Sequence, residues 1–388
     1  MEIEKQILPG NSWVVGNLPF GCKLCMQGMK VVYFMGGDCN HPSHCQWYCP
    51  VSEHRRSSRA HFVDELAISS PDDINSILTT LKKEIDTVKA KGMSFTGGDP
   101  LSSPRKKNMV CAIIRELKVI YGPDFHIHLY TSGVTFDSLI AEQLDQAGLD
   151  SLRFHPSQAD ISKIELAMGH SYSVGAEVPV IPMEENHRLL LELIEYLQAV
   201  GADYINLNEF EMCAPNQEAL LEKKFNLKQG TLATVEGSRE YADRILEKIL
   251  PSSNLTVHFC SVVVKDQVQI RQRYLRRAEK IKYPYEEISD DGCLLFLRIQ
   301  GPVSEVRKIE KILQKKVKIP QRMMNLNPTK GTLDLPPVLA EEIGFRELLT
   351  DFQVKCGIFE ILPFREPELG EIREYTPVFD NLPRHSVN

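Results

Sequence analysis

The sequence has no run of the roughly 18 to 20 uninterrupted apolar residues that a membrane helix needs, because charge or glycine breaks its most hydrophobic segments. Its start, MEIEKQILPG, carries neither the basic nor the apolar part of a secretion signal. An excess of positive charge is also lacking, since 45 Lys and Arg stand against 52 Asp and Glu and the formal net charge is −7. This balance argues against a surface built for nucleic acid, which stays a possible but not a favoured partner. We expect a cytoplasmic protein with no membrane partner.

Internal repeats and low-complexity tracts are absent too, so the chain is not a repeat array or a disordered protein. Its 388 residues, 43% hydrophobic and 25% charged, can form one large domain and a smaller one without covalent staples. The 10 cysteines therefore predict metal or redox chemistry in a reducing compartment rather than a disulfide framework.

Between residues 30 and 265, short apolar runs alternate with longer amphipathic stretches, a pattern typical of βα units around a parallel sheet. We expect a partial or complete (βα) barrel of the TIM type. The predicted strands are Lys30–Met35, Gly92–Thr96, His126–Tyr130, Ser151–His155, Gly175–Ile181, Tyr204–Asn208 and Leu255–Val264. The predicted helices are Asp72–Lys91, Arg105–Tyr121, Thr135–Ala147, Glu184–Val200 and Ser238–Leu250.

The remaining segments divide by composition. Residues 1–29 form an N-terminal segment with a CxxC motif, and residues 266–285 are rich in Lys and Arg at helical spacing, which predicts a basic linker helix. Residues 286–364 mix strand and helix patterns, as in a small α+β domain. Residues 365–388 are rich in proline and charge, and we expect them to form an extended surface tail.

Three cysteines follow the first predicted strand, in the sequence KVVYFM-GGDCNHPSHCQWYCP. Cys39, Cys45 and Cys49 would therefore share one loop at the carboxyl end of a strand, where barrel enzymes carry their chemistry. Three thiolates can hold three irons of a [4Fe–4S] cube and leave the fourth iron open, whereas an electron-carrying cluster takes four cysteines. A structural zinc site is the rival interpretation, with His41 and His44 as further ligands.

A glycine turn, Thr96-Gly97-Gly98-Asp99-Pro100, follows the second predicted strand. Two glycines let a small molecule approach the backbone closely, and the carboxylate of Asp99 can accept a bond from an ammonium group. A lone Gly-Gly-Asp is a weak signal. Its place one βα unit after the cysteine loop strengthens it.

Together these motifs resemble the radical S-adenosylmethionine superfamily over residues 14–265. The segments GCKLCMQGMKVVYFMGG, CQWYCPVSEHRR, SFTGGDPL and HFCSVVVKDQVQIRQRYLRRA are similar to a mainly archaeal group related to pyruvate formate-lyase activating enzyme. The family spaces its cysteines by three and then two residues, whereas this chain has five and then three.

The resemblance implies an oxygen-sensitive [4Fe–4S] cluster on the three loop cysteines, whose open iron binds S-adenosylmethionine. An electron from a low-potential donor such as ferredoxin or flavodoxin would cleave it to a 5′-deoxyadenosyl radical. Gly97, Gly98 and Asp99 would bind its amino group, and Tyr48 would lie near its adenine. Polar residues at later strand ends are further candidate contacts, with Ser132 and Asn208 ranked ahead of Arg153, Glu177, Asn206 and Glu209.

Cys22 and Cys25 form the CxxC motif, for which three interpretations stay open: half of a second iron–sulfur cluster, half of a zinc site, or a redox pair. Cys260 or Cys356 could complete such a metal site. Histidines 126, 128 and 155 alternate with apolar residues in predicted strands, which favours a structural role.

The substrate stays open between an organic cofactor, RNA, a peptide and a glycyl-radical partner protein. The alternative from another class is a non-catalytic zinc or iron–sulfur protein with a structural or electron-transfer role.

Overall fold

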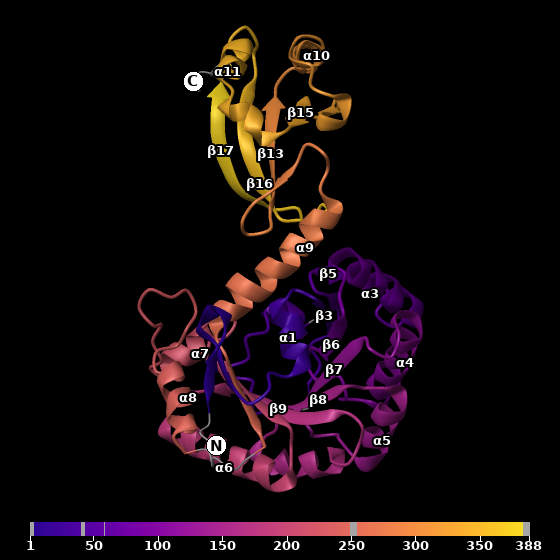
Figure 1. Ribbon diagram of the computed structural model, residues 1–388, viewed down its shortest axis with the longest axis vertical. Helices are drawn as coiled ribbons and strands as arrows, with labels where there is room; N and C mark the ends of the chain where they lie inside the picture. The colour runs from indigo at the N-terminus through magenta and orange to yellow at the C-terminus, as the bar shows by residue number, and fades with distance from the viewer. Residues whose placement is uncertain (1–3, 40–42, 58, 249–253, 383–388) are drawn as a thin grey trace. The chain divides into compact units, whose positions relative to one another are not determined.

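The structure is a computed structural model that describes residues 4–39, 43–57, 59–248 and 254–382, apart from the side chains of Ser57 and Ile343. The chain forms two compact units, Met1–Ile270 and Arg271–Asn388 (Figure 1). Each unit has a hydrophobic core of its own. In the described part of the chain, no helix is both long and apolar enough to cross a membrane.

The first unit is built on a run of parallel strands in chain order (Figure 1). These strands are β3 (Lys30–Phe34), β6 (Gly92–Thr96), β7 (His126–Thr131), β8 (Ser151–Phe154), β9 (Ser173–Val180), β10 (Tyr204–Glu209) and β11 (Thr256–Cys260). The two outer strands do not pair with each other: β3 pairs with β4 (Phe62–Val63), and β11 with β2 (Trp13–Val15), both antiparallel. The predicted α/β barrel is therefore confirmed in its partial form.

Helices cover the outside of this sheet because each presents one apolar stripe to the strands. They are α3 (Ile74–Val88), α4 (Pro104–Tyr121), α5 (Ser138–Ala147), α6 (Glu184–Val200) and α8 (Ser238–Leu246), with the 3₁₀ segment η2 (Gln158–Ala167) after β8. The side chains of Asp73, Ser103 and Asp137 accept backbone N–H bonds at three of the helix starts. The end of the predicted helix at Leu250 lies outside the described residues.

Side chains alternate strictly along the parallel strands. On β3, Val31 and Tyr33 are fully buried in the core beneath the helices, whereas Lys30 and Val32 line a cavity inside the barrel. On β7, Ile127 and Leu129 face the helices, and His128 and Tyr130 face inward. The outer face of the sheet is thus apolar and the inner face is largely polar.

The N-terminal segment is part of the barrel. Strands β1 (Lys5–Ile7) and β2 form a hairpin that extends the sheet beside β11. Helix α1 (Phe20–Met26) then lies within the ring of strands (Figure 1). Gly21 packs so closely there that a Cβ atom would lie 2.7 Å from Nδ1 of His128.

One predicted strand is too long. The expectation was Leu255–Val264, but β11 ends at Cys260, and Val264–Ile270 is the π-helical segment η3. The Ser261 hydroxyl accepts a bond from the Val264 backbone N–H at 3.0 Å, and the Ser261 N–H donates to the Ser12 hydroxyl at 3.0 Å. These local bonds turn the chain into a helix although its residues are β-branched.

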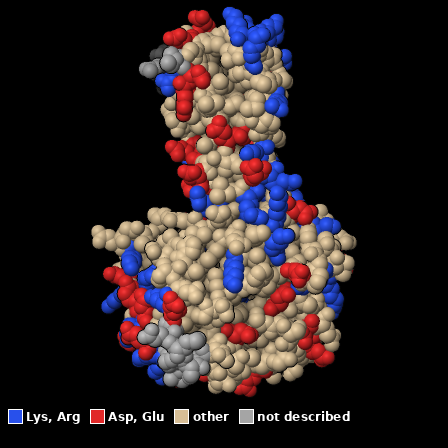
Figure 2. Space-filling view, viewed as in Figure 1, with Lys and Arg blue, Asp and Glu red and all other residues tan. Residues whose placement is uncertain are grey.

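The second unit begins with helix α9 (Arg271–Ile281) and contains an antiparallel sheet in the order β14-β15-β13-β16-β17, with β12 also paired to β13. Its strands are β12 (Glu287–Ile288), β13 (Leu294–Gln300), β14 (Asn325–Asn327), β15 (Thr332–Leu335), β16 (Lys355–Ile361) and β17 (Ile372–Asp380). Helices α10 (Val303–Ile312) and α11 (Ile343–Leu349) complete it. Lys and Arg side chains gather around α10 (Figure 2).

The expected surface tail needs a correction. Ile372–Asp380 forms β17, which pairs along β16, and Val378 and Phe379 pack against the core of the second unit. The segment is mostly exposed, as an edge strand is, which is why its composition resembles that of a tail. Residues 383–388 lie outside the described residues.

Candidate functional site

The cysteine loop leaves the carboxyl end of β3. Cys39, Cys45 and Cys49 are all half-buried. Burial, followed by the nearby Cys45 and Cys49 thiols, raises the pKa of Cys39 to about 11. Burial likewise raises the pKa of Cys45, whose sulfur lies 3.0 Å from the Ser43 hydroxyl. Three thiols thus influence one another electrostatically, and a bound cationic centre would favour their thiolate forms.

The Gly-Gly-Asp turn at the end of β6 holds this loop. The backbone N–H of Gly98 donates to the Gly36 carbonyl, and that of Asp99 to the Asp38 carbonyl, both at 2.8 Å. Gly97 has φ +136°, and a Cβ atom on Gly98 would lie 2.0 Å from the Asp38 oxygen. Only glycine fits at this contact. The N–H groups of Gly98 and Asp99 are therefore used to position the cysteine loop.

Asp99 is almost fully buried and fixes the neighbouring strand end. Its carboxylate accepts bonds from the Leu101 N–H at 2.9 Å, the Ser132 N–H at 3.0 Å and the Thr131 hydroxyl at 3.2 Å. The Ser132 hydroxyl donates to it as well. Two predicted site residues, Asp99 and Ser132, are thus brought into direct contact.

Lys106 on α4 is a site residue that no sequence motif predicts. Its ammonium lies 3.9 Å from an Asp38 carboxylate oxygen and has no hydrogen-bond partner among the described residues. Burial lowers the pKa of the Lys106 ammonium, although Asp38, Asp99 and Cys39 act to raise it. A cation therefore lies beside the cysteine loop, on the first turn of a helix whose sequence reads as an ordinary solvated face.

Two cavities adjoin the loop. The first, about 410 Å³, is within the range of small-molecule sites. Its lining includes Cys39, Cys45, Gly97, Gly98, Asp99, Ser132, Glu177 and Asn208, and it descends to Lys30, Val32 and Ser94. The second, about 380 Å³, is lined by all three loop cysteines together with Gly97 and Gly98. Cys39, Cys45 and the glycine turn thus line both cavities.

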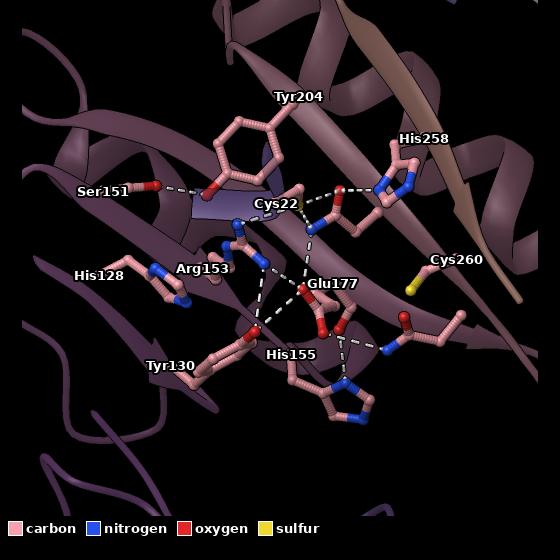
Figure 3. A network of polar contacts seen from close by, with 12 residues as sticks. Cys22, His128, Tyr130, Ser151, Arg153, His155, Glu177, Tyr204, His258 and Cys260 are labelled. Carbon is pink, nitrogen blue, oxygen red and sulfur yellow. Dashed lines mark hydrogen bonds and ion pairs between the residues drawn. The ribbon is translucent and has the colours of Figure 1, made fainter. Parts of the chain in front are cut away.

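An ion pair crosses the barrel interior (Figure 3). The Arg153 guanidinium lies 2.6 Å from the Glu177 carboxylate, which also accepts bonds from the side-chain amides of Asn206 at 2.8 Å and Asn208 at 3.1 Å. Burial alone would raise the pKa of Glu177, but Arg153 and the two amides outweigh it and lower the pKa to about 2. The carboxylate is therefore ionised.

Tyr48 lies beside the main cavity rather than on its wall. Its hydroxyl is 3.0 Å from Nε2 of His155, and His155 Nδ1 is 2.8 Å from the Glu177 carbonyl oxygen. Tyr48 and His155 line a third cavity of about 240 Å³ together with His44, which stacks on His155 at 5.1 Å between ring centroids. His41, the other histidine considered as a zinc ligand, lies outside the described residues.

The CxxC motif lies on α1, inside the barrel. Cys22 sulfur is 3.3 Å from an Arg153 nitrogen and 3.5 Å from the Asn206 amide nitrogen (Figure 3). Burial would raise the pKa of Cys22, but Arg153 and His258 lower it to about 6. Cys25 lies near Lys30, the first residue of β3. The pair is thus placed toward the amino ends of the strands, whereas the cysteine loop follows their carboxyl ends.

Among the described residues, no group of three or more His, Cys, Asp or Glu side chains is already arranged to hold a metal ion. The three loop thiols would have to move closer together to bind a metal centre. They still fit a three-cysteine cluster, because they belong to one loop and line one cavity together with Gly97 and Gly98.

No protein-family model matches the chain. A protein of Methanocaldococcus jannaschii named "Putative glycyl-radical enzyme activating enzyme" is 32% identical over 293 residues, which is 72% of each chain. Identity of this extent establishes common descent and a shared family.

Solved structures give weaker likenesses. The radical S-adenosylmethionine methyltransferase TsrM of Kitasatospora setae, with a tryptophan substrate and an S-adenosylmethionine analogue, matches at TM-score 0.36 and 11% identity, over 71% of this chain and 58% of that one. The same enzyme with cobalamin and a [4Fe–4S] cluster matches at TM-score 0.34 and 11% identity, over 64% and 52%. This chain thus spans less than two thirds of TsrM.

Proposed function

The chain belongs to the radical S-adenosylmethionine superfamily and is an enzyme of it, and from this premise we propose that it cleaves S-adenosylmethionine reductively to start hydrogen-atom abstraction. Cys39, Cys45 and Cys49 would hold a [4Fe–4S] cluster. When bound, the cluster would supply the electron that splits the sulfonium into methionine and a 5′-deoxyadenosyl radical. A low-potential donor such as ferredoxin or flavodoxin would deliver that electron.

The observation that carries this proposal is the shared cavity. One space is lined by thiols of the cysteine loop, by the Gly97–Asp99 turn, and by Ser132 and Asn208 from two other strand ends. Ser132 and Asn208 would contact S-adenosylmethionine. The turn would keep the loop in place through its two N–H bonds. Residues from several strands form the cavity walls, and a substrate bound between them would keep water and other C–H bonds away from the radical.

Four substrate classes suit this chemistry: an organic cofactor, RNA, a peptide and a glycyl-radical partner protein. The relative's name favours activation of a glycyl-radical partner protein. In that case a glycine-containing loop of the partner would enter the cavity.

The deciding experiment is anaerobic. Iron, sulfide and zinc are counted in the purified protein, and deoxyadenosine is assayed after addition of dithionite and S-adenosylmethionine. We expect about four irons per chain, with deoxyadenosine lost in Cys39→Ala, Cys45→Ala and Cys49→Ala. Cys111→Ala is the matched control, because Cys111 is buried on α4.

Each other outcome has a meaning. About eight irons would place a second cluster at Cys22 and Cys25. Stoichiometric zinc without deoxyadenosine would overturn the radical mechanism and leave a non-catalytic metal protein.

A further inference from the structure

The floor of the main cavity carries a cation that forms no ion pair within the described part of the chain. Lys30, the first residue of β3, lines the cavity although it is only 9% exposed. Its Nζ atom lies 3.5 Å from Nε2 of His128 across β6. The strand between them has Gly92 opposite Lys30, so no side chain blocks the lysine's path along the floor.

The charge of Lys30 contributes to the low pKa of Glu177, but the ring in contact with the Lys30 ammonium is neutral. Burial lowers the pKa of His128 well below its usual value, so its ring is uncharged. Among the described residues Lys30 forms no ion pair. Arg153, another cation facing the interior, differs because it lies against the Glu177 carboxylate.

A second polar group on the same floor also has no partner. Ser94 is 1% exposed, and its hydroxyl makes no hydrogen bond within the described part of the chain. It lines the same cavity as Lys30. In the sheet it is paired with Val32 of β3 on one side and His128 of β7 on the other. A buried hydroxyl without a partner needs one from a ligand.

We infer that this floor binds an anionic group of the substrate, a carboxylate or a phosphate, through the Lys30 ammonium and the Ser94 hydroxyl. The inference rests on the proposed function and narrows it. The substrate would be a small organic anion, anchored at the floor with its reacting C–H bond directed up toward the cysteine loop. The glycine residue of a partner loop carries no such group of its own.

Anomalous diffraction from crystals soaked in bromide tests the site without any cofactor. We expect a bromide peak in contact with Lys30 Nζ and Ser94 Oγ in the wild type and in Lys82→Met, a control on the exposed face of α3. Lys30→Met should remove the peak, and Ser94→Ala should lower its occupancy several-fold. Absence of a floor peak in the wild type, or its persistence in Lys30→Met, overturns the inference.

Competing ions identify the group. Sodium acetate or inorganic phosphate is added to the bromide soak, and the ion that removes the floor peak at the lower concentration indicates a carboxylate or a phosphate. Failure of both ions to reduce the peak contradicts the assignment. Lys30→Arg keeps the charge and should keep the peak, which separates loss of binding from loss of folding.

Deoxyadenosine formation separates this inference from the proposed function. If the wild type with its cluster makes no deoxyadenosine, the proposed function fails whatever bromide shows. If deoxyadenosine forms but the floor stays empty, only the anion site fails. A glycine-centred peptide that stimulates Lys30→Met as strongly as the wild type would point to a protein substrate and overturn the anion site.

Discussion

At the scale of single residues, Asp99 joins two strand ends through one buried carboxylate. Replacing it by alanine leaves the N–H groups of Leu101 and Ser132 without their acceptor. Hydrogen bonds to a charged group contribute about 1.5 to 3 kcal/mol, so we expect Asp99→Ala to lower the free energy of unfolding by about 3 kcal/mol.

Tryptophan fluorescence during urea unfolding measures this loss, because both tryptophans, Trp13 and Trp47, belong to the first unit. Asp124→Ala, on an exposed turn, is the matched control and should change the value by less than about 0.5 kcal/mol. Equal losses in the two variants would contradict the positioning role of Asp99.

The low pKa of Glu177 predicts that the fold loses stability in acid. Its pKa falls from 4.5 to about 2 on folding. A lowered carboxyl pKa stabilises the fold above the unfolded value, and this stabilisation is lost as pH drops from about 4.5 toward 2. Glu177→Gln should remove that slope. It should also cost about 3 to 5 kcal/mol at pH 7, since Arg153 is left buried without its partner.

The measurement is urea unfolding at several pH values between 2 and 7. Glu195→Gln, on the exposed face of α6, should follow the wild-type profile. A Glu177→Gln protein that still loses stability as steeply as the wild type below pH 4.5 would rule out this carboxylate as the source.

Sequence reasoning reached the loop cysteines and the glycine turn because both are contiguous motifs. It did not reach Lys30, Ser94 or Lys106 as site residues. Each is a single polar residue, and its meaning depends on which strand or helix lies opposite. The contact of Asp99 with Ser132 joins residues 33 positions apart, which no local pattern encodes.

At the scale of elements, α1 fits inside the ring of strands because Gly21 has no side chain. A Cβ atom there would lie 2.7 Å from His128 and 3.1 Å from His126. We expect Gly21→Ala to destabilise the first unit by about 1 to 3 kcal/mol through overpacking. Alkylation of Cys22 in the native protein should also become faster, since displacement of α1 exposes it.

The fluorescence transition and mass-spectrometric labelling rates check this. Gly344→Ala on α11 is the control, because a Cβ there meets nothing within 4 Å. It should leave both readouts unchanged. Unaltered labelling of Cys22 in Gly21→Ala would mean that α1 does not seal the barrel through this contact.

Element prediction succeeded where apolar and polar residues alternate along the strand, as in β6 and β10. It missed β1, β2, β14 and β15, which have three or four residues and depend on pairing with a neighbour. It assigned β17 to a tail, since its exposed residues show little of the alternation of a half-buried strand.

At the scale of the whole molecule, each compact unit has its own core, so unfolding should occur in two steps. Tryptophan fluorescence reports only the first unit, whereas far-ultraviolet circular dichroism reports both. We expect the two urea curves to differ. Leu335→Ala, fully buried in the second core, should cost about 2 to 5 kcal/mol in the dichroism curve only.

Asp99→Ala provides the reciprocal control, because it should shift the fluorescence curve. Coincident transitions for the wild type and for both variants would show that the two units unfold as one.

The alternation of apolar and polar side chains along the barrel strands separates two tasks that most proteins combine. Residues such as Val31 and Ile127, beneath the helices, supply the apolar contacts that stabilise the fold, while Lys30 and Ser94 line the cavity. Evolution can therefore rewrite the inner surface for a new substrate while the outer scaffold stays intact. Related chains with unlike chemistry are expected to differ most at these inward positions.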